Sequence, residues 1–340
     1  MKVLHVLASN KFSGAENVVC QIIKMFKGEV EMAYCSPNGE IKQTLEGMNI
    51  QFFPLEKLNV KNLKKVVAEF KPDIIHAHDL KACMVASRIK EIKKVAHIHC
   101  SHKDMKRLGL RALIAKRVFS KFDKIIWVSK ESEREFIFKN GIKNKSMVLE
   151  NIISIEDINL RKEKARLSQG YDVVYCGRLV DIKDPLRILE IAKLVDRNLN
   201  FGIIGDGELS VQLEEKINEY GLENRVKLLG FVENPYKIIE NSGVMLLTSK
   251  SEGTPMTVLE SLSLKTPVIS TAVGGMSNLI KNNENGFLFK TNLEAANIIN
   301  NLLKNSQKLQ ILKEKTFKFA KNYNDVNTYK HQLRAIYNEK

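Results

Sequence analysis

Short apolar runs alternate with segments of helical periodicity along most of the chain, and this alternation limits the fold more than any other feature of the sequence. The runs are almost continuously apolar, as expected for parallel strands that helices cover on both faces. In the first half, strands are predicted at Val3–Leu7, Ile74–His76, Val95–His99 and Lys124–Val128, and helices at Gly14–Phe26, Leu63–Phe70, Leu80–Ile89 and Met105–Phe119. In the second half, strands are predicted at Asp172–Cys176, Asn200–Ile204, Val226–Leu229, Val244–Leu247, Pro267–Ser270 and Gly286–Phe289, and helices at Leu186–Val195, Leu209–Tyr220, Thr254–Leu264 and Leu293–Asn305. The pattern predicts an α/β protein built on doubly wound parallel sheets.

The length of 340 residues suits two such domains. The polar stretch Ser154–Gly170 interrupts the alternation and is the predicted linker. We therefore predict an N-terminal domain over residues 1–160 and a C-terminal domain over residues 170–322, facing each other across a cleft. A helix is predicted over residues 323–340, after the last domain strand. In sheets of this kind, ligands bind at the carboxyl ends of the strands.

A formal net charge of +15 limits the choice of partners. Residues 1–160 hold 28 Lys and Arg against 18 Asp and Glu, so most of the excess lies in the first half. The sequence shows no helix-turn-helix, zinc-finger or RNA-binding signature, and nucleic acid is therefore not the predicted partner. An anionic membrane surface or a diphosphate-bearing substrate is favoured instead.

Cysteine usage and hydropathy indicate the cell compartment. The five cysteines are scattered without a C-x-x-C pair, which indicates neither a disulfide framework nor a zinc site and fits a reducing cytoplasm. No apolar run reaches about 18 residues, so no membrane span is predicted. The N-terminus shows no secretory leader and is predicted to be a first buried strand.

Two glutamates flank the start of a predicted helix in the second half. Glu252 precedes the helix and Glu260 lies inside it, with seven residues between them. Thr254 is predicted to cap this helix and Pro255 to occupy its first position, and the amides around Met256–Val258 would bind phosphate. Carboxylates placed there accept hydrogen bonds from sugar and ribose hydroxyls. The same spacing also fits a capped helix with two surface glutamates.

Two glycine-containing turns follow neighbouring strands of the second half. In the turn Gly177–Lys183, Arg178 and Lys183 place two cations at a strand's carboxyl end, where they can neutralise a leaving diphosphate. Solvated cations on a loop would show the same pattern. The turn Gly205–Ser210 lacks the last glycine of a dinucleotide fingerprint, because Ser210 stands there. A turn that admits close approach of a ligand is favoured over a NAD site.

Histidines are concentrated in two segments, His76–His78 and His97–His102. Alternate residues of a strand share a face and could bind a metal, but no carboxylate or cysteine cluster completes a site, and no metal is predicted. His99, at a strand's carboxyl end, is predicted to contact substrate. The first turn, Ser9–Glu16, leads into a helix that opens at Gly14. The amides of this turn would face the ligand. The same segment also fits a helix start without a binding role.

The segment Ser101–Lys124 carries eight Lys and Arg against two Asp, interleaved with apolar residues. A basic amphipathic helix of this composition can lie on anionic lipid. It can equally be solvated on one face and packed on the other.

These segments, in this order, resemble the retaining glycosyltransferases of family 4, which have the GT-B fold of two Rossmann-like domains. The resemblance covers almost the whole chain and rests mainly on Glu252 and Glu260 as an E-x7-E pair, with Gly177–Val180 and Lys183 upstream. Three positions depart from the family pattern: Ser13 replaces a first-loop glycine, Gly274–Asn278 lacks a glutamate, and Thr266 replaces a glycine before Pro267.

The resemblance implies roles for single residues. Arg178 and Lys183 would hold the donor diphosphate, Glu252 would contact the donor sugar, and Glu260 would bind the ribose hydroxyls. His99 would lie near the reacting sugar and complete the catalytic group. The other donor contacts would come from Gly14, Gly205, Phe231, Val232, Gly253, Thr254, Met256, Val258 and Leu259.

The resemblance also implies a reaction. A hexosyl or N-acetylhexosaminyl residue would move from a nucleotide-diphosphate donor, with a UDP-sugar first in order, to an acceptor hydroxyl with its anomeric configuration retained. No D-x-D motif occurs, so neither a metal nor another cofactor is expected. The acceptor would be a lipid-linked saccharide in cell-surface polysaccharide or glycan assembly, and the enzyme would be cytoplasmic and peripheral on the inner face of the membrane. Two alternatives stay open: a GT-B-fold epimerase of UDP-sugars, and a non-catalytic partner subunit of a glycosyltransferase complex.

Overall fold

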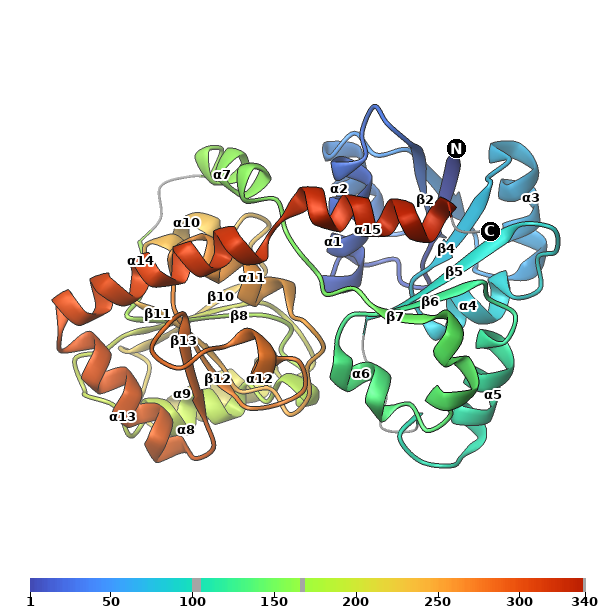
Figure 1. Cartoon of the computed structure of the whole chain (residues 1–340). Coiled ribbons are helices and arrows are strands. Elements are labelled where there is room, and N and C mark those ends of the chain that lie inside the picture. The colour runs from blue at the N-terminus through green and yellow to red at the C-terminus, as the bar shows by residue number, and fades with distance from the viewer. Residues whose placement is uncertain (100–104, 166–168, 339–340) are drawn as a thin grey trace. The chain divides into compact units, whose positions relative to one another are not determined.

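Two parallel sheets organise the protein, whose computed structural model describes residues 1–99, 105–165 and 169–338 (Figure 1). The chain divides into two compact units. Unit 1 comprises Met1–Ile152 and Val326–Lys340, and unit 2 comprises Ile153–Asp325. The predicted linker is therefore part of unit 2, where most of it forms a helix.

Unit 1 holds a seven-stranded sheet in the order β3-β2-β1-β4-β5-β6-β7. Its strands are β1 (Lys2–Val6), β2 (Glu31–Pro37), β3 (Phe52–Leu55), β4 (Ile74–Ala77), β5 (Lys93–Ile98), β6 (Lys124–Trp127) and β7 (Ser146–Val148). Its helices are α1 (Gly14–Met25), α2 (Ile41–Gly47), α3 (Val60–Phe70), α4 (Leu80–Ala86), α5 (Leu110–Phe119), α6 (Lys130–Glu135), the 3₁₀ helix η2 (Lys139–Lys145) and α15 (Val326–Asn338). One core cluster joins β1 and β2 to α1 and α2, and another joins the opposite face to α3, α4 and α5.

Unit 2 holds a six-stranded sheet in the order β10-β9-β8-β11-β12-β13. Its strands are β8 (Val173–Cys176), β9 (Phe201–Ile204), β10 (Val226–Gly230), β11 (Val244–Leu247), β12 (Val268–Thr271) and β13 (Gly286–Phe289). Its helices are α7 (Ile155–Glu163), the 3₁₀ helix η3 (Asp181–Lys183), α8 (Leu186–Ala192), α9 (Ser210–Glu219), α10 (Tyr236–Glu240), α11 (Met256–Ser263), α12 (Met276–Leu279), α13 (Asn292–Leu303) and α14 (Ser306–Tyr323). No helix of the described ranges combines the length and apolar character needed to span a membrane.

Both sheets share one topology. The strand pairs found among the described residues are all parallel, and each sheet starts in its middle and runs to one edge before returning to the other side. The direction changes between β1 and β4 in unit 1 and between β8 and β11 in unit 2. At such a switch point the loops after the two strands leave in opposite directions and open a crevice for ligands. The predicted doubly wound α/β fold is confirmed.

Side-chain caps fix the starts of several helices. An Asn, Asp, Ser or Thr side chain accepts a hydrogen bond from the backbone N–H three residues later, which satisfies one of the free donors of the first turn. The capping residues are Asn59, Asp79, Ser129, Ser154, Thr291 and Asn305. Each cap contributes about 1 kcal/mol to stability.

The last helix, α15, packs on unit 1 through both polar and aromatic contacts. Lys330 and Arg334 form ion pairs with Glu29, which follows α1. The Lys93 ammonium donates to the carbonyl oxygens of Ile336 and Tyr337 at 2.9 and 3.0 Å, an arrangement that suits the partial negative charge of a helix C-terminus.

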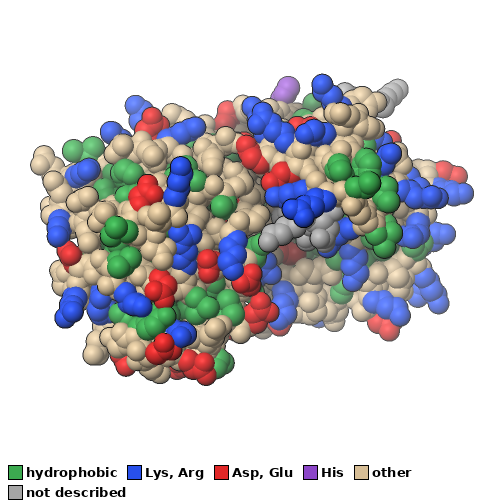
Figure 2. Space-filling model, turned by 90° about the horizontal axis from the view of Figure 1, so that it is seen from below, with side chains coloured by type: hydrophobic (Ala, Val, Ile, Leu, Met, Phe, Trp, Pro, Cys, Tyr) green, Lys and Arg blue, Asp and Glu red, His purple; other side chains and the backbone are tan. Residues whose placement is uncertain are grey.

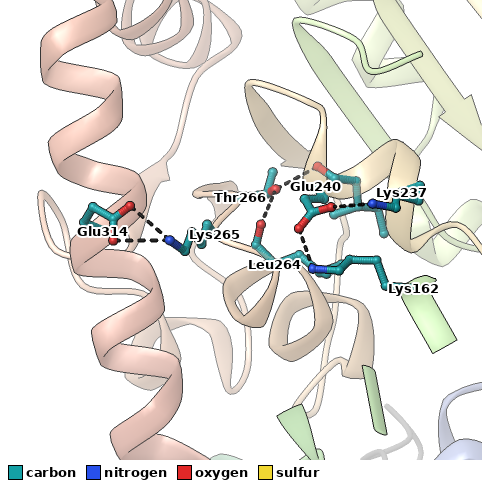
Figure 3. Close-up of polar contacts among 8 residues, drawn as sticks. Lys162, Lys237, Glu240, Leu264, Lys265, Thr266 and Glu314 are labelled. Carbon is teal, nitrogen blue, oxygen red and sulfur yellow. Dashed lines mark hydrogen bonds and ion pairs between the residues drawn. The ribbon is translucent and has the colours of Figure 1, made fainter. Parts of the chain in front are cut away.

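Polar contacts also join the helices of unit 2 (Figure 3). The Glu240 carboxylate at the end of α10 accepts from Lys162 of α7 at 2.6 Å, and Lys265 pairs with Glu314 of α14 at 3.1 Å. Thr266 is fully buried, and its hydroxyl donates to the carbonyl oxygen of Ile239 at 2.7 Å. The threonine that replaces a family glycine therefore connects the turn after α11 to the end of α10.

Several sequence predictions differ from the structure. The strands β2, β3 and β7 and the helices α2, α6, α7, α10, α12 and α14 were not predicted. The helix predicted over Met105–Phe119 begins at Leu110. The C-terminal helix begins at Val326, because α14 continues to Tyr323.

Candidate active site

The loops that follow β8, β9 and β11 meet at the carboxyl edge of the second sheet. The Leu179 N–H donates to the carbonyl oxygen of Asp206 at 2.9 Å, and the Leu209 N–H donates to that of Leu179 at 3.0 Å. The Lys250 N–H donates to the carbonyl oxygen of Ile182 at 2.9 Å. These hydrogen bonds hold the two predicted turns and the Glu252 loop against one another at the switch point.

Two glycines allow the backbones to come this close. Gly205 has a φ of +138°, and a Cβ at this position would lie 1.9 Å from the carbonyl oxygen of Gly177. Gly274 has a φ of +52°, and its Cβ would lie 1.8 Å from the carbonyl oxygen of Glu252. Both backbone conformations are ones that side-chain-bearing residues rarely adopt. Gly205 therefore acts here as a packing residue of the loop edge, where the prediction had expected close approach of a ligand.

Lys183 and Glu252 form an ion pair across the switch point. The Lys183 ammonium lies 2.5 Å from Glu252 Oε1, and the Ser249 hydroxyl donates to the same oxygen at 2.6 Å. The side chains are 23% and 8% exposed, so the pair is shielded yet open to solvent at its lysine end. The structure thus brings together Lys183, which was predicted to hold the diphosphate, and Glu252, which was predicted to contact the sugar. The two residues lie 69 positions apart in the sequence.

Arg178 lies at the same edge, beside β8. Its side chain is exposed, and its carbonyl oxygen accepts from the Tyr175 hydroxyl at 3.0 Å. Burial raises the pKa of Tyr175, the Glu252 carboxylate raises it further, and the Arg178 guanidinium opposes them. The charges of Arg178 and Glu252 therefore act on one buried ring, which places both near the end of β8.

Glu260 occupies a more buried position on α11. The residue is 9% exposed, and its Oε1 accepts from the Tyr236 hydroxyl at 3.3 Å. That hydroxyl also accepts from Arg161 at 2.9 Å. Burial raises the pKa of the Cys176 thiol to about 12, and the Glu260 carboxylate adds to this shift. The carboxylate thus faces the end of β8, and no motif of the sequence had indicated Tyr236 as its partner.

The start of α11 differs from the prediction. The helix begins at Met256, so Pro255 occupies the capping position in an extended conformation, and Thr254 makes no cap. The Val258 N–H donates to the carbonyl oxygen of Pro255 at 3.1 Å. The predicted anion site therefore lacks that amide.

The remaining predicted donor contacts of unit 2 fall into two sets. Gly253, Thr254, Met256, Val258 and Leu259 are buried. Phe231 and Val232 follow β10, and the Phe231 ring is 71% exposed. The Gly205 N–H donates to the carbonyl oxygen of Gly230 at 2.8 Å, which joins this segment to the same loop edge.

Unit 1 carries the other predicted residues, Gly14 and His99. Gly14 opens α1 behind Ser13, whose hydroxyl donates to Glu16, and a Cβ at Gly14 would meet nothing within 4 Å. His99 directly follows β5 and is half-buried. Its Nε2 lies 3.0 Å from Nδ1 of His78.

The structure gathers more histidines around His99 than the sequence segments indicated. His5, His76, His78 and His97 are buried beside it, and the sequence analysis missed His5 because it stands alone in its strand. Two triads have ligand nitrogens within 4.8 Å of one another, His5–His76–His78 and His78–His97–His99. The residues His102 and Ser101–Asp104, which belong to earlier predictions, lie outside the described residues.

The basic segment of unit 1 exposes apolar side chains as well as charges. Leu108, Leu110 and Leu113 are 72%, 76% and 49% exposed and stand among Arg107 and Arg111 at the start of α5. Figure 2, which views the molecule from the side where α5 lies in Figure 1, shows basic and apolar side chains next to one another.

Two family models match the chain. "Glycosyltransferase Family 4" matches residues 12–157, and "Glycosyl transferases group 1" matches residues 156–319. A glycosyltransferase of Methanocaldococcus jannaschii is 31% identical over 245 residues, which are 64% of this chain and 60% of that relative's length. The UDP-Gal:alpha-D-GlcNAc-diphosphoundecaprenol alpha-1,3-galactosyltransferase of Escherichia coli is 27% identical over 330 residues, covering 86% of this chain and 84% of the relative.

The fold itself also occurs among solved structures. HepE of Anabaena, in complex with UDP-glucose, has a TM-score of 0.85 and 24% sequence identity, with 98% of each chain covered. This likeness extends over both units and supports the architecture described above.

Proposed function

Because the chain belongs to the family 4 glycosyltransferases and has their GT-B fold, we propose that it transfers a hexose or N-acetylhexosamine from a UDP-sugar to an acceptor hydroxyl with retention of configuration. The observation that carries the proposal is the Lys183–Glu252 pair at the β8/β11 switch point, with Arg178 beside it. A cation for the diphosphate and a carboxylate for sugar hydroxyls are the two groups that a nucleotide sugar requires at one site.

The charges at this edge suit departure of a diphosphate. Arg178 and Lys183 neutralise the negative charge that develops as the bond between the sugar C1 and the diphosphate oxygen breaks. The acceptor oxygen forms the new bond on the same face of the sugar, and its proton passes to the departing phosphate oxygen. His99 contacts the reacting sugar. Two protein cations perform the neutralisation that a metal ion would otherwise perform, so the reaction needs no metal cofactor.

The two glutamates take separate tasks. Glu252 already accepts from Lys183 and Ser249, which orients its carboxylate toward the sugar hydroxyls. Glu260, held by Tyr236, binds the ribose hydroxyls. Gly14, Gly205, Gly253, Thr254, Met256 and the backbone at Val258 and Leu259 line the donor, and Phe231 with Val232 lies at the base.

The acceptor in this proposal is a lipid-linked saccharide of cell-surface polysaccharide or glycan assembly. The Escherichia coli relative is named for an acceptor of this class, a diphosphoundecaprenol-linked sugar. The exposed leucines and arginines at the start of α5 would hold the enzyme on the inner face of the membrane, as a peripheral cytoplasmic protein. Sedimentation with anionic but not neutral liposomes at low salt supports this part, and no sedimentation removes it.

A transfer assay tests the function directly. The protein is incubated in EDTA with UDP-, GDP- and ADP-sugars and a diphosphoundecaprenol-linked GlcNAc acceptor, and the product's anomeric configuration is read by NMR. We expect transfer from a UDP-sugar, an unchanged anomeric configuration, and full activity in EDTA. An inverted product would contradict the retaining mechanism, and loss of activity in EDTA would contradict the metal-independent one.

A further inference from the structure

Five of the chain's seven histidines share one face of three neighbouring strands in unit 1. His5 lies on β1 opposite His76 of β4, and His97 lies on β5. His78 and His99 continue the same faces just beyond β4 and β5, because alternate residues of a strand point the same way. Four of them are at most 1% exposed, at positions where a sheet of this kind normally buries Val or Ile.

Three of these imidazoles form a hydrogen-bonded chain. His5 Nδ1 lies 2.9 Å from His78 Nε2, and His78 Nδ1 lies 3.0 Å from His99 Nε2. Both nitrogens of His78 are thereby used. The chain begins in the core at His5 and ends at the half-buried His99, beside the carboxyl end of β5.

The imidazoles of the chain are neutral at pH 7. Burial lowers the pKa of His5 and of His99 to about 3, and burial with neighbouring histidines lowers that of His78 well below its ordinary value. A neutral imidazole carries one N–H and one lone pair. The protons of the three rings must therefore all point in one direction along the chain, either toward His99 or toward His5.

The inner end decides the direction. His5 Nε2 is buried without a hydrogen-bond partner. Either direction leaves one N–H without a partner, at His5 Nε2 or at His99 Nδ1, and an unpartnered N–H costs least where a ligand or water can reach it. His5 is fully buried and His99 is half-buried, so the unpartnered N–H belongs on His99, and His5 keeps its proton on Nδ1 and donates to His78. His78 then donates from Nδ1 to His99 Nε2. Since that nitrogen of His99 accepts, the proton of His99 must lie on Nδ1.

Two further imidazoles pack against the hydrogen-bonded rings and restrict their orientation. His76 lies against His78 at a tilt of 30° with ring centroids 4.2 Å apart, and His97 stacks on His99 at 4.3 Å. His76 Nδ1 lies 2.8 Å from the Tyr337 hydroxyl of α15. His99 Nδ1 is itself buried without a partner. In the hydrogen-bonded chain of His5, His78 and His99, the Nδ1–H of His99 is therefore the donor that has no acceptor, and a ligand oxygen can accept from it.

We propose that His5 and His78 set the tautomer of His99, so that His99 presents an Nδ1–H donor to an oxygen of the substrate, and that His78 is a positioning residue of the transfer reaction. The second part rests on the proposed function. A metal site is the competing account of the cluster. Both His78 nitrogens are already hydrogen-bonded to other imidazoles, and His78 belongs to both candidate triads, so neither triad has all three ligands free for a metal.

NMR of ¹⁵N-histidine-labelled protein tests the tautomer without any substrate. Two-bond ¹⁵N–¹H correlations distinguish an Nδ1–H from an Nε2–H ring, and His99→Gln identifies the His99 signals. We expect Nδ1–H at His99 in the wild type and Nε2–H, the ordinary form of free histidine, in His78→Phe. An Nε2–H wild-type His99 overturns the proposal, as does an unchanged tautomer in His78→Phe.

Kinetics test the positioning role. His78→Phe should lower kcat about 10- to 100-fold with the donor KM within about twofold. His78→Gln should restore most of the rate, because its amide accepts with oxygen and donates with nitrogen as His78 does. The control is His331→Gln, an exposed histidine of α15 outside the cluster. Equal rates for the Phe and Gln variants, at equal melting temperature, would contradict the role.

Two further outcomes have defined meanings. Stoichiometric zinc, copper or nickel in purified wild-type protein, lost in His78→Phe, would replace the hydrogen-bonded chain by a metal site. If the wild type transfers no sugar, the proposed function fails while the NMR result still decides the tautomer.

Discussion

The two sheets of the protein have the same strand order except for the additional edge strand β7 in unit 1, but opposite chemistry lies at their switch points. At β8/β11 of unit 2, Lys183 and Glu252 meet as a charged pair that keeps part of its solvent exposure. At β1/β4 of unit 1, His5, His76 and His78 are buried and neutral. The fold therefore sets where a ligand site forms, and the exposure of the strand ends sets whether charge can be kept there.

The largest effect is expected at the charged switch point. Lys183→Ala should lower kcat about 100- to 1,000-fold, because a preorganised cation facing the leaving diphosphate is lost. The matched control is Lys250→Ala, which removes a lysine of the same loop edge paired at 2.6 Å with an exposed Asp181. The kcat of Lys250→Ala should stay within about twofold of the wild-type value in steady-state assays. Equal losses of kcat in Lys183→Ala and Lys250→Ala would mean that the total positive charge of this loop edge, and not the position of Lys183, determines the rate.

Substitutions at one glycine of each unit compare how tightly the backbone is packed there. Gly205→Ala should destabilise unit 2 by about 2–3 kcal/mol, since it adds a strained φ and a contact of 1.9 Å with the Gly177 carbonyl oxygen. Gly14→Ala in unit 1 should change stability by less than about 1 kcal/mol, because its Cβ meets no atom within 4 Å. Urea denaturation measures both. Similar midpoints for the two variants would contradict the close approach of the unit 2 loops.

Acid should destabilise unit 1 before it destabilises unit 2. The folded pKa of His5 is about 3 and its ordinary value is 6.5, so the unfolded chain binds the proton first as pH falls. Stability present above pH 6.5 is therefore lost between pH 6.5 and about 3, and at pH 5 the loss is about 2 kcal/mol for His5 alone.

Hydrogen exchange by mass spectrometry at pH 7 and pH 5, corrected for intrinsic rates, checks the acid effect. Peptides of β1, β4 and β5 should lose protection before those of β8 and β11. Parallel loss in both sheets would mean that the histidines do not control the acid response of unit 1.

The smallest effect is expected away from both edges. Thr266→Val keeps the volume of a fully buried side chain and removes its hydrogen bond to the carbonyl oxygen of Ile239. Thermal unfolding should report a loss of about 1 kcal/mol. No loss would mean that the turn after α11 does not depend on this threonine.

The alternation of apolar runs was sufficient to predict most of the strands, because strands buried on both faces are almost continuously apolar. Strand β2 was missed although it lies between β1 and β3 and is buried along most of its length. Among the edge strands, β10 and β13 were predicted, whereas β3 and β7 were not. Strand β3 contains Pro54, which removes a ladder donor and makes a sequence run look unlike a strand. The capping role assigned to Thr254 failed because the helix starts one residue later than the Thr-Pro pattern indicated, after Pro255 in an extended conformation.

The candidate site was predicted residue by residue but not contact by contact. Lys183 and Glu252 belong to loops of different strands, and only the order β8-β11 makes them neighbours. His5 was missed for the same reason, since its partners lie on strands 70 or more residues away. Parallel topologies bring distant segments together, and sequence spacing alone does not encode which strands pair.

Donor binding tests the central claim most directly. Calorimetric titration of wild type, Glu260→Ala and the exposed control Glu215→Ala with the UDP-sugar that supports transfer measures the contribution of the α11 carboxylate. Losing a charged hydrogen-bond acceptor for the ribose should weaken binding at least about tenfold in Glu260→Ala and leave Glu215→Ala unchanged. Full donor affinity in Glu260→Ala would contradict the assignment of the donor site to this edge of the second sheet.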